Sequence, residues 1–137
     1  MKLSRTVAYA LHATIQLARS ETAGTPIPCS RLADEGQMPE RFLLQILRNL
    51  VTHGILESKR GVEGGYSLER RPEDVSLLEL IEAVDGPFVS TILVHEGLPV
   101  ESRAKLECAL DDVVEHARRR LKAITLAHLL PPDGDAA

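Results

Sequence analysis

The sequence feature that most constrains the fold is a pair of glycines, Gly64 and Gly65, placed shortly after an amphipathic run over 41–56. The pair lies between two short segments with strand character, 55–60 and 66–69. Paired glycines adopt the positive backbone dihedral angles that tight hairpin turns require. The order of helix, basic strand, glycine turn and second strand therefore predicts a helix followed by a β-hairpin, in the arrangement of a wing.

Two short helices are predicted before this hairpin. The first begins at Cys29 or Ser30 and is ended by Gly36. The second is expected to have Pro39 at its first helical position, where the missing N–H costs nothing. Two short helices joined by a turn of about four residues form a helix-turn-helix. The predicted fold class is therefore mainly α with a small β-hairpin, a winged helix-turn-helix over 1–87.

The helix after Pro39 has an apolar and a polar face. The apolar face, expected to point into the core, consists of Phe42, Leu43, Ile46, Leu47 and Leu50. The opposite face carries Arg41, Gln45, Arg48, Asn49 and Thr52. Side chains of these types donate to phosphates and read base edges in the major groove of DNA. This helix is therefore the candidate recognition helix.

The hairpin and the N-terminus supply further candidate contacts. Lys59 and Arg60 at the mouth of the hairpin are expected to hold phosphate or enter the minor groove. The complete set of candidate DNA-binding residues is Ser4, Arg5, Pro39, Arg41, Gln45, Arg48, Asn49, Lys59, Arg60, Gly64, Gly65 and Tyr66. Helix pairs of this kind also occur in proteins that never touch DNA. A winged-helix module that binds another protein is therefore the alternative.

A third class is an enzyme or nucleotide-binding protein that uses the hairpin glycines as a phosphate cradle. The motif Gly61-Xaa-Xaa-Gly64-Gly65 lacks the Lys-Ser/Thr pair of a P-loop, and it does not stand between a strand and a helix. The sequence shows no grouping of serine, histidine and aspartate, or of paired carboxylates, that would mark a catalytic centre. We therefore expect no enzymatic activity, and the histidine spacing indicates no metal site.

The net charge of -4 hides an asymmetry along the chain. Residues 1–71 hold 10 lysines and arginines against 7 acidic residues, whereas residues 72–137 hold 6 against 13. A basic lobe of this kind suits phosphate binding, although ordinary scatter of surface charge also produces it. Two cysteines in 137 residues fit a reducing, cytoplasmic setting. No segment approaches the roughly 20 apolar residues that cross a bilayer, so no membrane partner is expected.

The C-terminal part is predicted to form a long helix over 103–130. Its apolar stripe consists of Leu106, Leu110, Val113, Ala117, Leu121 and Ile124. A lone helix of this length would leave the stripe in water, so it must pack on another surface. A two-fold symmetric partner suits paired DNA half-sites, and folding back on its own domain is the alternative. A connecting or sensor loop is predicted over 88–102, and a disordered tail over 131–137.

Five groups of residues resemble the Rrf2 family of bacterial transcription regulators. They are Met1-Lys2-Leu3-Ser4, Tyr9-Ala10-Leu11-His12-Ala13, Pro39 with Phe42-Leu43 and Ile46-Leu47, Arg60-Gly61-Xaa-Xaa-Gly64-Gly65-Tyr66, and Leu80-Ile81-Xaa-Ala83-Val84-Xaa-Gly86. The resemblance covers most of 1–87. It implies a winged helix-turn-helix and a homodimer joined through the C-terminal helix. The expected function is a sequence-specific regulator, a repressor, that binds double-stranded DNA at a pseudo-palindromic operator.

Several members of the family carry an iron-sulfur cluster on three cysteines in the loop before the dimerisation helix. The present chain has two cysteines, Cys29 and Cys108. Ala8 and Leu44 stand where some members have an acidic ligand and a cluster-responsive glutamate. The resemblance therefore implies a regulator without a cluster. An atypical cluster shared across the dimer through Cys108 and His12 is the alternative.

Cys108, His12 and Cys29 are the candidate sensor residues. Cys29 lies near a helix N-terminus, which could lower the pKa of its thiol, or it could simply be a small residue at a helix start. Cys108 on the flank of the apolar stripe and His12 beside the apolar face of the first helix could likewise serve packing. A small-molecule or protein effector could bind at the loop over 88–102, and a plain connector is equally consistent with its sequence.

Overall fold

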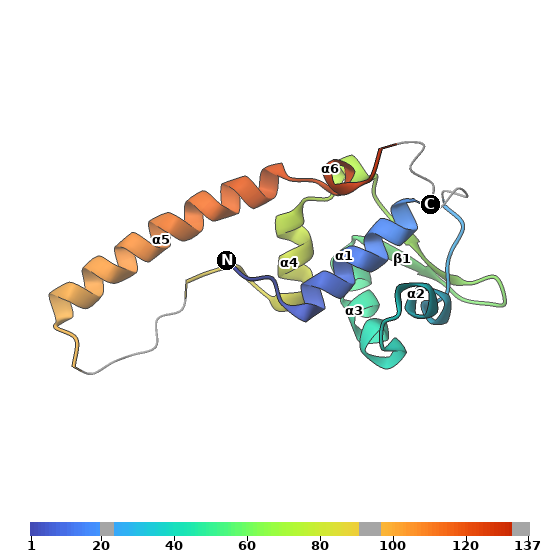
Figure 1. The fold of residues 1–137 in the computed structure, drawn as a ribbon, viewed down its shortest axis with the longest axis horizontal. Coiled ribbons are helices and arrows are strands. Elements are labelled where there is room, and N and C mark those ends of the chain that lie inside the picture. The colour runs from blue at the N-terminus through green and yellow to red at the C-terminus, as the bar shows by residue number, and fades with distance from the viewer. Residues whose placement is uncertain (20–23, 91–96, 133–137) are drawn as a thin grey trace.

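The computed structural model describes residues 1–19, 24–90 and 97–132. Its elements are α1 (Arg5–Ala18), α2 (Cys29–Gly36), α3 (Glu40–Thr52), β1 (Leu56–Lys59), β2 (Gly65–Leu68), the 3₁₀ turn η1 (Pro72–Asp74), α4 (Leu77–Asp85), α5 (Val100–Ala123) and α6 (Leu126–Leu129). The predicted fold class, mainly α with one antiparallel hairpin, is confirmed. Helices α1–α4, α6 and the hairpin form a body, from which α5 projects (Figure 1). Parts of the predicted loop and tail, residues 91–96 and 133–137, lie outside the described residues.

The core of the body is built around α1 and α3. From α3, Leu43, Ile46, Leu47 and Leu50 are at most 2% exposed. The expectation that Phe42 joins them is wrong, because its side chain is 43% exposed and meets the ring of Tyr9 edge-on at 5.8 Å. The buried positions recur at intervals of three and four from position 43, and position 42 lies at the margin of that stripe.

The turn between α2 and α3 is closed by backbone hydrogen bonds. Gln37, not Gly36, adopts the left-handed conformation, with φ of 52°. Gln37 N–H donates to Asp34 O at 3.3 Å and Met38 N–H donates to Ala33 O at 2.8 Å, which is a Schellman arrangement. Gly36 belongs to α2, and a Cβ there would lie 2.6 Å from Cε of Met38. The expectation that α2 ends at Gly36 is therefore confirmed, although the left-handed conformation falls on Gln37 and not on the glycine.

The hairpin turn lies earlier than expected. Lys59 pairs with Gly65, so residues 60–64 form the connection and Gly65 already belongs to β2. The turn is closed by Gly64 N–H donating to Gly61 O at 3.0 Å. Gly61 and Gly65 have positive φ, of 116° and 149°, whereas Gly64 does not. A Cβ on Gly64 would collide with the carbonyl oxygen of Lys59, so both glycines of the pair are needed for close approach.

The predicted long helix is interrupted. Helix α5 ends at Ala123, Ile124 takes an extended conformation, and Thr125 caps the short helix α6. Leu77 N–H donates to Ile124 O at 2.8 Å and Leu126 N–H donates to Val75 O at 3.0 Å. The Leu126 side chain is completely buried in the core. The chain therefore leaves the helix after Ala123, pairs with the start of α4 and places Leu126 in the core.

Most of α5 lies away from the body. All residues of α5 are described, and Leu121 is the one buried side chain among them. It packs in a smaller, satellite core with Val7, Leu77, Leu78 and Ile81. The last turns of α5 therefore rest on α1 and α4, and the earlier turns extend beyond them (Figure 1). In the described part of the chain no helix is long and apolar enough to span a bilayer.

Candidate nucleic-acid interface

The outer face of α3 is polar because its inner face is fixed in the core. Burial of Leu43, Ile46, Leu47 and Leu50 turns the intervening positions outward. Arg41, Gln45, Arg48 and Thr52 are exposed, and Asn49 is partly exposed. The structure therefore brings the expected recognition-helix residues together on one surface.

The amides on this surface lie one helical turn apart. Gln45 Nε2 donates to Asn49 Oδ1 at 3.3 Å. The Gln45 carbonyl oxygen can still accept a hydrogen bond from a ligand, and the Asn49 amide hydrogens can still donate one. Amides at such positions are the groups that pair with adenine in the major groove. Thr52 differs, because its hydroxyl donates to Arg48 O at 3.0 Å within the helix. Gln45 and Asn49 are thus the candidates for reading bases.

Two cations on α3 and two on the hairpin are available for a ligand. Arg41, Arg48, Lys59 and Arg60 form no ion pair with any described residue. Several arginines elsewhere are engaged with carboxylates, and these are Arg31, Arg70, Arg71, Arg103, Arg118 and Arg119. A charge without an internal partner can neutralise a phosphate at no loss of an existing contact.

The wing is braced by a segment that the sequence did not point to. Ile27 N–H donates to Tyr66 O at 2.9 Å, and Tyr66 N–H donates to Ile27 O at 2.8 Å. A Cβ on Gly65 would meet the backbone of Ile27 and Pro28. The sequence signal for this contact is the glycine itself, since a glycine inside a strand marks close backbone approach. Val62 is fully exposed at the tip of the turn, next to exposed Arg60.

The N-terminal candidates differ in their surroundings. Ser4 caps α1 by accepting from Val7 N–H at 3.1 Å, and its own hydroxyl donates to Asp85 Oδ2 at 2.7 Å. Its hydroxyl is therefore engaged inside the protein, whereas Arg5 is exposed. Pro39 is exposed and precedes α3 as its N-cap residue, one position before the place expected for it.

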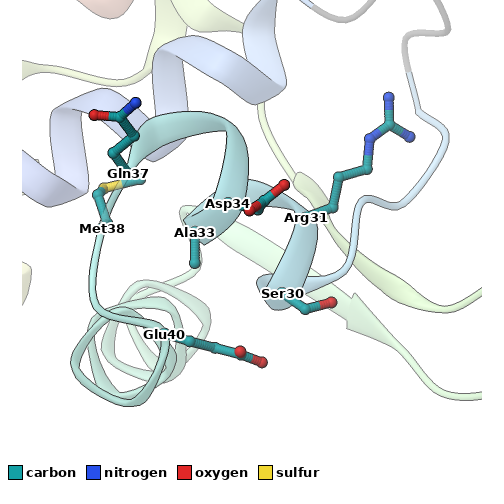
Figure 2. Close-up of a pocket in the computed structure, with 7 residues that line it drawn as sticks. All are labelled: Ser30, Arg31, Ala33, Asp34, Gln37, Met38 and Glu40. Carbon is teal, nitrogen blue, oxygen red and sulfur yellow. The ribbon is translucent and has the colours of Figure 1, made fainter.

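An open depression of about 690 Å³ lies where the N-termini of α2 and α3 approach each other. It is lined by Ser30, Arg31, Ala33, Asp34, Gln37, Met38 and Glu40 (Figure 2). Pro28 and Pro39 precede the two helices, and neither helix has a side-chain cap. Uncapped N–H groups at helix starts favour anions such as phosphate. Ser30 is thus a candidate contact that the sequence did not indicate, whereas Arg31 beside it is already paired with Glu35 at 2.9 Å.

The two thiols occupy different environments. Cys29 is buried, and its thiol donates to Glu40 O at 3.7 Å. Burial, reinforced by the negative charge of Glu40, raises the pKa of this thiol above its usual 9.0. A raised pKa disfavours the reactive thiolate, so the structure favours the packing interpretation of Cys29. Cys108 is exposed on α5, and His12 is exposed on α1.

The residues present do not fit a three-thiolate cluster site. The chain has two cysteines, of which one is buried in the helix-turn-helix and the other is exposed on α5. Over residues 1–19, 24–90 and 97–132, no three histidine, cysteine, aspartate or glutamate side chains are grouped to hold a metal ion.

The stripe predicted for dimerisation is divided by the structure. Leu106 and Val113 are 40% and 61% exposed, and Leu110 and Ala117 are half-buried. Leu121 instead packs against α1 and α4, and Ile124 lies beyond the end of α5. At Leu121 the helix folds back on its own domain, as the alternative expected. The other residues of the stripe within α5, from Leu106 to Ala117, leave an apolar face on the projecting part of the helix.

Comparisons with known proteins agree with this geometry. The family model for Rrf2, described as an iron-dependent transcriptional regulator, matches residues 3–132. The relative Rv1287 of Mycobacterium tuberculosis is 38% identical over 125 residues, which span 90% of this chain and 75% of the relative. The HTH-type transcriptional regulator CymR of Bacillus subtilis is 28% identical over 101 residues, 74% of this chain and 72% of CymR.

Two solved structures share the fold. The structure of B. subtilis CymR, a global cysteine regulator, has a TM-score of 0.73 at 26% identity and covers 94% of this chain and 95% of its own. The structure of T. potens IscR has a TM-score of 0.67 at 25% identity, with coverage of 94% and 85%. The protein is thus a DNA-binding transcription regulator and not an enzyme. The chain belongs to the Rrf2 family.

Proposed function

We propose that the protein acts in the cytoplasm as a homodimeric repressor that binds a pseudo-palindromic operator. The observation that carries this proposal is the polar outer face of α3, together with cations of α3 and the wing that are unpaired among the described residues. The amides of Gln45 and Asn49 share this face with Arg41 and Arg48, which form no ion pair with any described residue. Such a surface combines base-reading groups with phosphate-binding groups, as specific DNA recognition requires.

The dimer is supported by the exposed part of α5. Val113, at 61% exposure, and Leu106, at 40%, share a helix face with Leu110 and Ala117. An exposed apolar stripe over several turns is costly in water and is covered when a second copy packs against it. A two-fold dimer presents two identical recognition helices, which matches an operator with two inverted half-sites.

Selection of binding sites from a random duplex library tests the operator. We expect the purified wild-type protein to enrich two inverted copies of one short sequence at a single spacing. Enrichment of a lone half-site would contradict the dimer, and enrichment of no sequence would contradict specific recognition.

The oligomeric state is tested by Val113→Glu, which places a charge in the stripe. Ala104→Glu is the matched control, because position 104 lies about 180° around the helix from position 113 at 100° per residue. Light scattering should report a monomer for V113E and a dimer for A104E and wild type. A dimeric V113E would show that another surface joins the subunits.

We further propose that the regulator works without an iron-sulfur cluster. The proposal is supported by the placement of the two thiols, one buried and one on α5. The test is the visible absorbance of anaerobically purified protein, together with iron and sulfide assays. Visible bands with stoichiometric iron and sulfide would overturn this part of the proposal.

Repression requires that the bound dimer block a promoter. A dimer on two half-sites about one helical turn apart covers DNA that RNA polymerase must also occupy. In transcription in vitro from a promoter overlapping the selected site, added protein should lower transcript yield, and the V113E variant should lower it less. An increase in transcript would indicate an activator.

A further inference from the structure

The start of the connector between α4 and α5 is held by one glutamate and one arginine. Glu82 on α4 accepts from Phe88 N–H at 2.9 Å through Oε2. The same oxygen accepts from Arg118 Nη1 of α5 at 3.0 Å, and Arg118 Nη1 also lies 3.0 Å from Phe88 O. Both backbone polar groups of Phe88 are therefore bound, one by α4 and the other by α5.

Local backbone geometry brings Phe88 to this position. Gly86 ends α4 with φ of 84°, a conformation that favours glycine, and Pro87 prevents the helix from continuing. The chain turns there, and the ring of Phe88 packs against the satellite core of α1, α4 and α5. Two residues on, Ser90 Oγ donates to Asp111 Oδ1 of α5 at 2.7 Å.

Asp111 and Arg118 lie seven residues apart, so they share one face of α5. The connector thus contacts this face of α5 twice, at Asp111 through Ser90 and at Arg118 through Phe88. Glu82 ties the contact at Arg118 to α4. We call Glu82, Phe88 and Arg118 the latch.

Among the described residues, the other contacts that hold α5 lie near its C-terminal end. Leu121 is its one buried side chain, and the chain beyond Ala123 is tied to the start of α4 through Ile124. A helix attached near one end can swing about that end. Arg118, one turn before Leu121, is placed to resist the swing, because a guanidinium holds a carboxylate and a carbonyl in fixed directions.

A small swing at the latch has a large effect further along. Leu106 lies 12 residues before Arg118, or about 18 Å along the helix at about 1.5 Å per residue. A rotation of about 10° would displace Leu106 by about 3 Å, which is close to the rise of about 3.4 Å per base pair. In a dimer joined through α5, a rotation of this size would change the separation of the two recognition helices by a distance on the order of one base pair.

We infer that the latch of Glu82, Phe88 and Arg118 sets the half-site spacing that the dimer accepts, with Arg118 as the positioning residue. This inference rests on the proposed homodimer on a two-half-site operator. The latch touches neither the outer face of α3 nor the exposed stripe of α5, so its loss leaves half-site sequence and dimerisation unchanged.

The variant Arg118→Met keeps a long, unbranched apolar side chain and removes the forked guanidinium group that contacts Glu82 and Phe88. Arg119→Met is the matched control, because Arg119 pairs with Glu115 at 3.7 Å within α5 and forms no ion pair with a described residue of α4. The random-duplex selection is run with wild type and both variants, and sequencing reports the distribution of spacings between half-sites. For wild type and R119M we expect one spacing, favoured about tenfold or more over spacings one base pair longer or shorter.

For R118M we expect the same half-site sequence, but a spread over neighbouring spacings with preference reduced to a few-fold. The variants Glu82→Gln and Arg118→Lys provide a second route if R118M does not fold. E82Q should broaden the spacing as R118M does, whereas R118K, which keeps the charge but loses the fork, should be intermediate.

A single spacing for R118M, E82Q and wild type alike would overturn the latch and leave the dimeric operator standing. A wild-type selection without paired half-sites would instead overturn the homodimer, and the latch with it. Loss of half-site sequence preference in R118M would assign Arg118 to folding of the DNA-binding body and would also overturn the inference.

Discussion

Ile27 and Tyr66 exchange both of their backbone hydrogen bonds, at 2.9 and 2.8 Å, although 39 positions separate them in the chain. The segment leading into α2 is thereby joined to the second strand of the wing. The wing and the helix-turn-helix are thus linked by main-chain contacts as well as by a shared core. Disturbing this bridge is expected to affect DNA binding through the orientation of the wing.

Gly65→Ala is expected to break the bridge. A Cβ at this position would meet the backbone of Ile27 and Pro28, and φ is 149°. We expect a loss of unfolding free energy on the order of 3 to 4 kcal/mol, as for other severe backbone clashes. Gly54→Ala is the control, because Gly54 has φ of 74° but no atom within 4 Å of the added Cβ. That variant should lose only about 1 to 2 kcal/mol, as measured by urea denaturation; equal losses would contradict the close approach.

Arg60→Met is expected to flatten the dependence of DNA affinity on salt. Arg60 is exposed and has no ion-pair partner among the described residues, so its charge can displace a counterion from DNA. The slope of log K against log salt should fall by about one unit. Arg71→Met is the control, since Arg71 is also exposed but is bound to Asp74 at 3.1 Å. Fluorescence anisotropy measures both slopes, and an unchanged slope for R60M would exclude a phosphate contact.

Gln45→Ala is expected to relax sequence preference rather than general affinity. The Gln45 amide is exposed and oriented by Asn49 at 3.3 Å, so it is placed to contact a base edge. Losing such a contact typically costs about 1 to 3 kcal/mol of discrimination at one base position. Binding to the selected duplex should weaken, while binding to a scrambled duplex stays the same. Equal weakening on both duplexes would assign Gln45 to the phosphate backbone.

Glu82 makes stability depend on pH in the acid range. The hydrogen bond from Arg118, and next the N–H of Phe88, lower the pKa of Glu82 below its ordinary 4.5. A carboxyl group with a lowered folded pKa stabilises the protein above its unfolded pKa, and that contribution is lost as the pH falls through the folded value. Wild type should therefore be more stable than Glu82→Gln at pH 7, and the difference should shrink below pH 4.5.

The control for this measurement is Glu115→Gln, whose carboxylate faces Arg119 at 3.7 Å and is 59% exposed. Thermal melts at pH 7 and in acid should show little change for that variant. A constant difference between wild type and E82Q across the whole pH range would contradict the assigned ion pair.

Cys29 is expected to resist alkylation in the native protein. Burial and the nearby Glu40 raise the pKa of its thiol, so little thiolate is present near neutral pH. In a Cys108→Ser variant, reaction with iodoacetamide should be slow under native conditions and fast in denaturant. Mass spectrometry follows both rates, and equally fast reaction in the two conditions would restore Cys29 as a candidate redox sensor.

Local periodicity determined much of the architecture. The spacing of Leu43, Ile46, Leu47 and Leu50 predicts both the helix and its buried face, and the polar face of Arg41, Gln45 and Arg48 follows from it. The Ser76–Glu79 capping box likewise marks the start of α4. Such features depend on residues a few positions apart, and the local chain geometry is the same in any protein.

Contacts between distant segments were decided by the tertiary structure. Whether a helix continues past Ala123 depends on Leu77, whose N–H donates to Ile124 O, and on Val75, whose carbonyl oxygen accepts from Leu126 N–H. Gly65 indicates in the sequence that the backbone turns or is closely approached at this position, but only the folded chain shows that the approaching segment is Ile27. Arg118 stands in the sequence beside Arg119 and Arg120 with nothing to distinguish it, and only the packing of α4 brings Glu82 to it at 3.0 Å. Backbone and charged groups form hydrogen bonds and ion pairs with the groups that tertiary packing brings near them. The residue spacing within one segment contains no information about which groups these are.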